Sequence, residues 1–536
     1  MGVSDHRSLI KLLDPKIIRV PSLSARNLPI VLNIGAKSIT MGFNSRYLMI
    51  FYVALGSFTY GFNNSVIGSV LGLNTFFEYF DLNPEPGNGS SNAIIGASSG
   101  LFAGGGAIGA LALAWLANKA GRVRSMQLTC LICIISGAIQ GGSIHIAMFL
   151  IGRFLSGIGV GLMVALVPIY QSEVSPTESR GKMVGSHGFL IVTGYACAAW
   201  TGFGCYFSPQ PEFQWRFELS AQIIAPALLL IGSPWLPESP RWLVDQDRHR
   251  DALTILRKLH SFQDGSTRED LAQNELDTIC AQLAVDRQVA RSVGGLALFK
   301  KPSYRKRLFC GCFTQFIGQS TGVLVINNYQ VMLYNSLGLY NSMPLLLYAV
   351  YLSWAAFMNY LSTFIIDRVG RVLLMVIGLL GGAIAVICEA AMVAEFSGTQ
   401  NKIGNGFGVF FLFVFVTFYG GCLDATTYVY SAEIFPTHAR GLGMGISIFT
   451  QFCATLVYTQ VAPVAFNTIQ WRYYLVFIII PVIGAVLMWF TFPETKCLSL
   501  EDISRAFEDQ EPRLDFAAQE GENGTQKNFF SHMENV

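Results

Sequence analysis

The stretch EVSPTESRG at residues 173–181 recurs as EIFPTHARG at residues 433–441, 260 residues further along the chain. Two shorter phrases recur in the same order: GRV at 121–123 returns at 370–372, and PES at 237–239 returns as PET at 493–495. Three phrases in one order, at offsets of 260, 249 and 256 residues, indicate that half of the chain is duplicated. Duplicated halves related by a pseudo-twofold axis are typical of secondary transporters, which bind their solute between the two repeats.

The composition is that of an integral membrane protein. Hydrophobic residues make up 52% of the 536 residues, charged residues only 13%, and the mean hydropathy is +0.45. A soluble domain carries roughly 25% charged residues. Apolar stretches of about 20 residues, enough to cross a bilayer, lie near 48–70, 93–117, 125–145, 147–170, 183–206, 218–236, 308–334, 343–366, 373–395, 405–430, 441–465 and 472–492.

These stretches predict the fold class: an all-α membrane protein with twelve transmembrane helices in two pseudo-symmetric six-helix bundles and short cytoplasmic helices. The linker between the bundles has apolar residues at helical spacing, for example over residues 251–260, which predicts amphipathic helices lying across the cytoplasmic face. The expected divisions are an N-terminal segment (1–47), the N-terminal bundle (48–236), the linker (237–307), the C-terminal bundle (308–492) and a tail (493–536).

Lysine and arginine predict the orientation of the chain. Thirteen fall in the linker, seven lie within the first 46 residues, and eight more occupy other loops on the same side. The opposite loops carry only Arg216, Lys402 and Arg472. Because positively charged loops stay in the cytoplasm, both termini and the linker are expected there, with the plasma membrane as the expected location.

Few features suggest chemistry other than transport. The eleven cysteines are scattered, most of them within spans, and the Cys130-x-x-Cys133 pair lies in an apolar stretch without His or acidic partners, so no metal site or disulfide framework is predicted. The glycine-rich run at residues 99–109 lacks the Lys-Ser/Thr ending of a phosphate loop and predicts close helix contact. We expect no catalytic residue, no cofactor and no nucleic-acid partner; the expected partners are the bilayer and a small solute, bound by a monomer. Asn88, in an outer loop, is a glycosylation candidate.

Charged residues of the repeat lie in matched sets at the cytoplasmic ends of the spans. Ionisable groups at the membrane edge cost less when paired and are seldom placed there for stability alone. Ion pairs that join the bundles when the pathway is shut would bias an alternating-access equilibrium. The alternative is that they only fasten neighbouring helix ends within one half. The gating candidates are Arg122, Arg153, Glu173, Arg180, Glu238, Arg241, Asp367, Arg368, Arg371, Glu433 and Arg440.

Several motifs together resemble one known family. They are PESPRWL at 237–243, Gly152-Arg153, Pro168-x-Tyr170-x-x-Glu173, Asp367-Arg368-x-Gly370-Arg371 and PETK at 493–496. Over roughly residues 45–505 the chain resembles the sugar porters of the major facilitator superfamily, in particular fungal members similar to hexose transporters. The resemblance implies two six-helix bundles around a central cavity, and transport of a sugar.

The chain departs from the family pattern in its first span. Family symporters have an Asp that takes the coupling proton where this chain has Asn63. An amide does not titrate, and family facilitators resemble this chain at that position. Arg153, whose family counterpart lies near that Asp, then needs a carbonyl or another acid as its partner, because an unpaired arginine at depth is costly.

The family's sugar contacts are kept only in part. Its Gln of the fifth span is replaced by Gly188, and the seventh span keeps one motif Gln but has Leu324 in place of an Asn. Groups that donate and accept hydrogen bonds, together with an aromatic face, suit a polyol; the alternative is hydrogen bonding between helices. The substrate-binding candidates are Gln319, Gln451, Asn327, Asn328, Asn359, Tyr428, His187 and Asn63.

Asp424 stands in the tenth span, where the family has a Gly-Pro phrase. An acid within a span is a functional candidate, and Asp424 is the proton-coupling candidate of this chain. The alternative is that it serves as a permanent partner for a donor such as His187 or Arg153.

We therefore expect transmembrane transport of a sugar or related polyol by alternating access, as facilitated diffusion. Three alternatives stay open. They are proton-coupled sugar symport using Asp424, transport of a quinate-like acid or secondary metabolite, and a nutrient sensor that does not transport.

Overall fold

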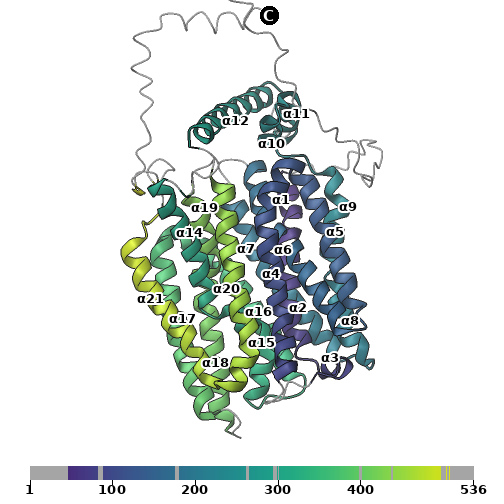
Figure 1. Ribbon diagram of the computed structural model, residues 1–536. Coiled ribbons are helices and arrows are strands. Elements are labelled where there is room, and N and C mark those ends of the chain that lie inside the picture. The colour runs from purple at the N-terminus through teal and green to yellow at the C-terminus, as the bar shows by residue number, and fades with distance from the viewer. Residues whose placement is uncertain are drawn as a thin grey trace, which may run out of the picture. The chain divides into compact units, whose positions relative to one another are not determined.

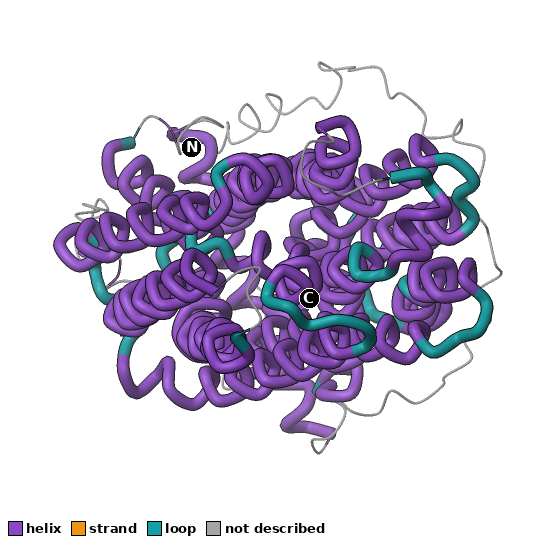
Figure 2. Tube along the Cα trace, turned by 90° about the horizontal axis from the view of Figure 1, so that it is seen from below, coloured by secondary structure: helices purple, strands orange, loops and turns teal. Residues whose placement is uncertain are grey.

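The computed structural model describes residues 46–82, 89–175, 180–260, 265–293, 299, 301–396, 401–435, 439–496, 503 and 506–507. All of them belong to one of the two compact units of the chain, Phe43–Val536. Every regular element within these ranges is a helix, and eleven segments are long and apolar enough to cross a membrane. Seen along the bundle, the described chain is helical throughout with short loops (Figure 2).

The first predicted span is present as two helices, α1 (Arg46–Val53) and α2 (Leu55–Val70), which adjoin at Ala54. The hydrogen-bond ladder continues through that residue, because Ala54 N donates to Ile50 O and Phe58 N donates to Ala54 O. Together they supply the twelfth spanning segment beside the other eleven.

The other N-terminal spans follow in order. They are α4 (Gly89–Ala120), α5 (Arg122–Gly141), α6 (Ile146–Val174), α7 (Arg180–Tyr206) and the pair α8 (Pro211–Ala221) and α9 (Ile224–Gly232), with the short helix α3 (Asn74–Tyr79) after the first span.

The C-terminal half repeats this sequence of six spans. They are α14 (Pro302–Ser320) with α15 (Val323–Ser336), α16 (Met343–Val369), α17 (Arg371–Phe396), α18 (Lys402–Phe418) with α19 (Asp424–Glu433), α20 (Arg440–Thr468), and α21 (Tyr474–Thr491).

Three helices of the predicted linker pack on one another at one end of the bundle, which we call the linker end (Figure 1). They are α10 (Pro240–Asp245), α11 (His249–Leu259) and α12 (Gly265–Val293). Helix α11 buries Ala252, Leu256 and Leu259 and exposes its charged face. The amphipathic pattern that predicted a helix there is therefore confirmed.

The two halves meet along helix pairs: α4 packs on α20, α7 on α16, and α2 on α15. The glycine-rich run of α4 permits this approach. A Cβ at Gly106 would lie 2.5 Å from the Phe452 ring of α20, and one at Gly105 would collide with the Phe154 carbonyl of α6. Small residues thus let helices approach closely, and this interface encloses the site described next.

Candidate functional site

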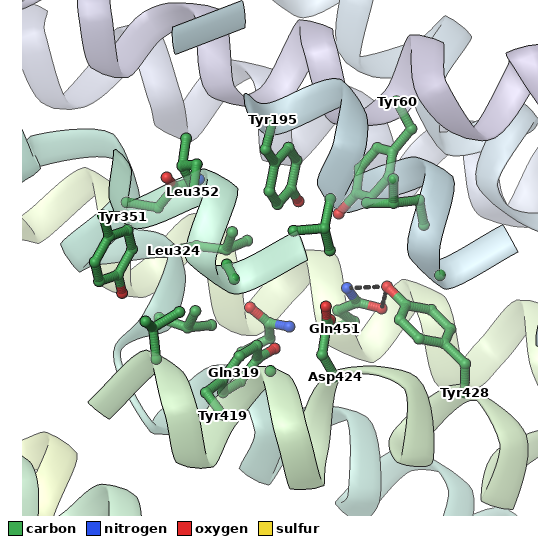
Figure 3. A pocket seen from close by; sticks show the side chains of 18 residues that line it. Tyr60, Tyr195, Gln319, Leu324, Tyr351, Leu352, Tyr419, Asp424, Tyr428 and Gln451 are labelled. Carbon is green, nitrogen blue, oxygen red and sulfur yellow. Dashed lines mark hydrogen bonds between the residues drawn. The ribbon is translucent and has the colours of Figure 1, made fainter. Parts of the chain in front are cut away.

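A cavity lies between the two halves, about midway along the spans (Figure 3). Both halves line it, and the lining mixes apolar side chains with hydroxyl and amide groups, as small-molecule sites do. The N-terminal half contributes Tyr60, Gly188, Ile191, Val192 and Tyr195; the C-terminal half contributes Gln319, Val323, Leu324, Asn327, Tyr351, Leu352, Ala355, Val416, Tyr419, Gly420, Asp424, Tyr428 and Gln451.

Two interruptions of regular helix place these residues. Helix α14 ends at Ser320, and α15 begins after Gly322, whose φ of +81° suits glycine. A Cβ at Gly322 would lie 2.7 Å from the Phe477 ring. Between α18 and α19, the residues Tyr419–Leu423 form a π-helical segment, a feature that often marks functional sites. Lining residues lie on both sides of each interruption.

Hydrogen bonds connect the polar lining groups. The Tyr428 hydroxyl and the Gln451 amide bond to each other, with Nε2 at 2.8 Å and Oε1 at 3.2 Å from the hydroxyl oxygen (Figure 3). Asn359 donates from Nδ2 to Asp424 Oδ2 at 2.6 Å. Thr455 donates to Gln319 Oε1 at 3.4 Å. The cavity wall is thus a set of groups whose hydrogen-bonding capacity is only partly used.

Five predicted site residues line the cavity: Gln319, Asn327, Asp424, Tyr428 and Gln451. The structure brings these residues together from α14, α15, α19 and α20. Whether a solute contacts them stays a prediction.

Three other candidates lie beside the lining rather than in it. Asn359 lies behind Asp424 and is buried. Asn328 is buried next to Asn327, and its Oδ1 has no hydrogen-bond partner among the described residues. His187 bonds through Nδ1 to Ser57 Oγ at 2.6 Å, and its ring meets the Tyr428 ring edge-on at 6.2 Å between centroids.

Asn63 is held by structural contacts on all sides. Its Oδ1 accepts a hydrogen bond from Ser156 Oγ at 2.6 Å, and its Nδ2 donates to Thr59 O at 2.9 Å. The side chain is fully buried and does not line the cavity. Both of its amide atoms are used between and within helices, and its contact with a solute stays a prediction.

Arg153 is fully buried and finds the carbonyl partners expected of it. Its Nε donates to Ser98 O and its Nη1 to Asn63 O, both at 3.0 Å, and its guanidinium lies 4.4 Å from the Phe102 ring centre. Its described contacts are these carbonyls and this ring rather than a carboxylate. Asp424, correspondingly, is bonded to Asn359 and not to Arg153 or His187.

Four lining tyrosines were missed by the sequence analysis: Tyr60, Tyr195, Tyr351 and Tyr419. Tyr60 and Tyr195 lie 6.3 Å apart between ring centres, and Asn64 donates to the Tyr195 hydroxyl at 2.9 Å. Tyrosine has an apolar ring and a polar tip. A tyrosine within an apolar stretch is the sequence signal that could have indicated these residues. The predicted substrate contacts were instead mostly amides at positions where the family binds sugar.

Two pairs of the predicted gating charges form equivalent clusters, one in each half. Arg122 binds Glu173 through Nη2 at 2.7 Å and Nε at 2.8 Å, and Arg371 binds Glu433 at 2.9 and 3.2 Å through the same atoms. These pairs each join helices of one half. Among the described side chains, they therefore match the alternative in which charges fasten helix ends within a half, and gating stays a proposal.

A second carboxylate completes each cluster. Glu238 accepts hydrogen bonds from the backbone N of Arg122 at 2.8 Å, and Glu494 accepts one from the backbone N of Arg371 at 2.8 Å. Glu238 thus accepts hydrogen bonds from the first amides of α5, and Glu494 does the same for α17. Burial raises the pKa of Glu238, while its amide donors and the Arg122 charge oppose that shift.

The remaining candidates are placed less fully. Arg241 lies in α10, Arg368 in the last turn of α16, and Arg440 at the start of α20. The backbones of Arg180 and Asp367 lie in α7 and α16, whereas their side chains and the glycosylation candidate Asn88 lie outside the described part of the chain.

Comparisons with known proteins assign the chain to a family. The family described as "Sugar (and other) transporter" matches residues 49–507. An MFS-type transporter of Aspergillus cristatus is 30% identical, over 85% of this chain and 92% of that protein. A high-affinity glucose transporter of Kluyveromyces lactis is 25% identical, over 87% and 86%.

A solved structure has the same fold. The proton:xylose symporter of E. coli, bound to 6-bromo-6-deoxy-D-glucose, superposes with a TM-score of 0.72 at 23% identity, covering 86% of this chain and 99% of that chain. The chain belongs to the sugar transporter family of the major facilitator superfamily; it is a multi-span membrane transporter with the twelve-helix fold, and not an enzyme.

Proposed function

We propose that this member of the sugar transporter family carries a sugar or related polyol through the cavity by alternating access, as facilitated diffusion. The observation that supports this most is the composition of the cavity wall. Gln319, Asn327 and Gln451 offer amide donors and acceptors, and five tyrosines offer rings and hydroxyls. A sugar ring presents hydroxyls at its edge and apolar C–H groups on its faces. Its hydroxyls can therefore bond to the amides and tyrosine hydroxyls, and its C–H faces can pack on the tyrosine rings.

Alternating access requires contacts between the halves that break as the cavity changes its opening. Away from the linker end, Ser65 Oγ of α2 lies 2.7 Å from the Tyr348 hydroxyl of α16, and that hydroxyl donates to Ser65 O at 3.1 Å. Gly68 of α2 also lies close to Tyr348 and to the Asn327 carbonyl of α15. These contacts join α2 of one half to α15 and α16 of the other, so a separation of the halves on that side needs them to break.

Facilitated diffusion is favoured because the usual proton site of family symporters holds Asn63, whose amide is engaged by Ser156 and Thr59. Proton symport is the second candidate, since Asp424 is a carboxyl in the cavity wall. In both cases we place the protein in the plasma membrane as a monomer, with both termini and the linker in the cytoplasm, on the distribution of Lys and Arg.

Counterflow in liposomes containing the purified full chain tests the proposal. Internal unlabelled hexoses, pentoses and sugar alcohols should each be tested against their labelled forms outside, with and without a protonophore. We expect at least one to exchange, with no change on adding the protonophore. Uptake against the solute gradient that an imposed inward proton gradient drives and a protonophore abolishes would select symport. Exchange of none of these solutes would leave the acid or secondary-metabolite transporter and the sensor as alternatives.

Epitope accessibility in intact cells tests the placement. Tags at the two termini should be reached by antibody only after the cells are permeabilised. Labelling of a terminal tag in intact cells would contradict the expected orientation.

A further inference from the structure

The cavity wall carries acidic but no basic chemistry. Among the described lining residues, Asp424 is the one carboxyl, and none is Lys, Arg or His. The Asp424 side chain projects toward the same space as Gln319 and Gln451 (Figure 3). An entering solute therefore meets one acidic group among neutral ones.

The nearby Arg and His side chains are bound elsewhere. Arg153 is fully buried against the carbonyls of Ser98 and Asn63. His187 is held by Ser57 behind Tyr428 and outside the lining. The hydrogen bond that Asp424 receives comes from Asn359, a neutral amide. Nδ2 and Oδ1 of Asn327, in the lining, and Nε2 of His187, beside it, have no hydrogen-bond partner among the described residues, and neither side chain is a Lys or Arg. Among the described lining residues, none carries a positive charge that could pair with an anion entering the cavity.

We propose that Asp424 makes the cavity select its solutes by charge, so that neutral polyols and amino sugars are accepted and carboxylated solutes such as uronates and quinate-like acids are excluded. This inference rests on the proposed function and narrows its substrate class.

The physical reason is the cost of a second negative group in an enclosed site. A carboxylated solute either faces a like charge or forces one of the two carboxyls to take up a proton. It also leaves its hydration shell without gaining a cationic partner. Two like charges about 6 Å apart at an effective dielectric constant of about 20 lower affinity by on the order of 100-fold. The ammonium group of an amino sugar at the same position is attracted by the Asp424 carboxylate.

Sugars of the same ring configuration that differ in charge at one substituent provide the test. Thermal stabilisation of the purified full chain by each solute is measured at neutral pH. Each of three series compares a neutral sugar with its amino sugar and its uronate, for glucose, galactose and mannose. Quinate is measured as a further carboxylated solute. In the series that binds best, we expect the uronate to bind at least about tenfold more weakly than the neutral sugar, and the amino sugar to bind more tightly than the uronate.

The decisive variant is Asp424→Asn, which keeps the size of the side chain and its contact with Asn359. We expect the uronate to come within about threefold of the neutral sugar in this variant. Asp424→Ser, smaller and also neutral, should show the same effect if the Asn variant does not fold. The matched control is Glu389→Gln, which removes a buried carboxyl of the same half outside the cavity and should keep the discrimination of the unmodified protein.

The outcomes separate charge selection from transport itself. A uronate or quinate that binds the unmodified protein as well as the neutral sugar overturns charge selection and leaves transport in place. Discrimination that persists in both Asp424 variants also overturns it. If no neutral sugar or sugar alcohol binds or exchanges, the proposed function fails and the inference fails with it.

Discussion

The guanidinium of Arg122 binds both carboxylate oxygens of Glu173, at 2.7 and 2.8 Å. The second half reproduces this pair as Arg371 and Glu433. It also reproduces a hydrogen bond from a tyrosine to a proline carbonyl: Tyr170 to Pro237 O at 2.7 Å, and Tyr430 to Pro493 O at 3.2 Å. The duplication seen in the sequence thus extends to individual hydrogen bonds. In each bundle the ion pair connects the ends of two helices, α5 with α6 in the first half and α17 with α19 in the second.

Replacing Glu173 with Gln should destabilise the protein. The Arg122 and Glu173 side chains are only 12% and 9% exposed, and breaking a buried pair leaves an uncompensated charge at a cost of about 3–5 kcal/mol. A fall in melting temperature of the purified protein would measure the effect. The control is Glu269→Gln, in a pair with Arg257 whose side chains are 44% and 48% exposed, where we expect about 0–1 kcal/mol. Equal losses in both variants would contradict a buried, structural pair.

Gly121→Ala and Gly370→Ala should both destabilise the protein by displacing the carboxylates of Glu238 and Glu494 from the ends of α5 and α17. The φ angles of the two glycines are +89° and +110°, where a side chain is strained, and a Cβ would lie 2.6 Å from Glu238 Oε2 and 2.9 Å from Glu494 Oε2 respectively. With ψ angles of 175° and 159°, this positive-φ extended backbone alone costs a residue other than glycine about 1–3 kcal/mol, and displacing the capping carboxylate adds to it. We expect both variants to melt earlier than the unmodified protein.

Gly204→Ala is the matched control for these two variants. Gly204 lies within α7, and a Cβ there would meet no atom within 4 Å. Alanine in a helix interior is favoured over glycine by roughly 0.5–1 kcal/mol, so this variant should be slightly stabilised. Melting temperatures that fall alike in all three would show that the cause is not the positive φ angle.

Much of the fold could be predicted from the sequence, because it depends on periodic and repeated signals. Apolar stretches of bilayer length and the repeat in 173–181 and 433–441 were sufficient for twelve spans in two halves. Polar residues within spans also predicted five of the residues that line the cavity. Such residues are costly in a membrane unless they meet a partner or a cavity, which holds for Gln319 and Gln451.

The details of the site depend on contacts between helices, which the sequence does not display. Asn63 and Gln319 are both amides in spans, yet only Gln319 reaches the cavity, because Ser156 of α6 engages Asn63. The tyrosines that line the cavity look like ordinary apolar residues in a hydropathy pattern. Which of them face inward depends on the rotation of α2 and α7 about their axes and on the π-helical segment before Asp424.

Replacing Gln451 with Leu should weaken the solute's binding more than it weakens the fold. The change removes an amide of the cavity wall and the two hydrogen bonds between that amide and the Tyr428 hydroxyl. We expect the KM of uptake to rise about tenfold or more with a smaller change in kcat. Gln127→Leu is the control, since Gln127 bonds to Ser233 Oγ away from the cavity; a similar rise in its KM would show that the effect is general.

Replacing Asn63 with Asp should make uptake depend on protons. The Nδ2 of Asn63 donates to the Thr59 carbonyl, so an ionised carboxylate would place an oxygen against that carbonyl, and the protonated form would restore the donor. Arg153 lies beside this position, bonded to the Asn63 carbonyl, and its Nη2 has no hydrogen-bond partner among the described residues. The arginine therefore favours the ionised form whereas Thr59 favours the neutral one, and a motion that changes their distances would bind and release a proton. We expect a protonophore to reduce uptake by Asn63→Asp and to leave the unmodified protein unaffected.

The control is Asn64→Asp. The amide of Asn64 contacts the Tyr195 hydroxyl instead, so uptake by this variant should stay independent of the protonophore. Proton dependence of the unmodified protein would contradict facilitated diffusion, and its absence in Asn63→Asp would contradict the proposed influence of Arg153 on the carboxyl.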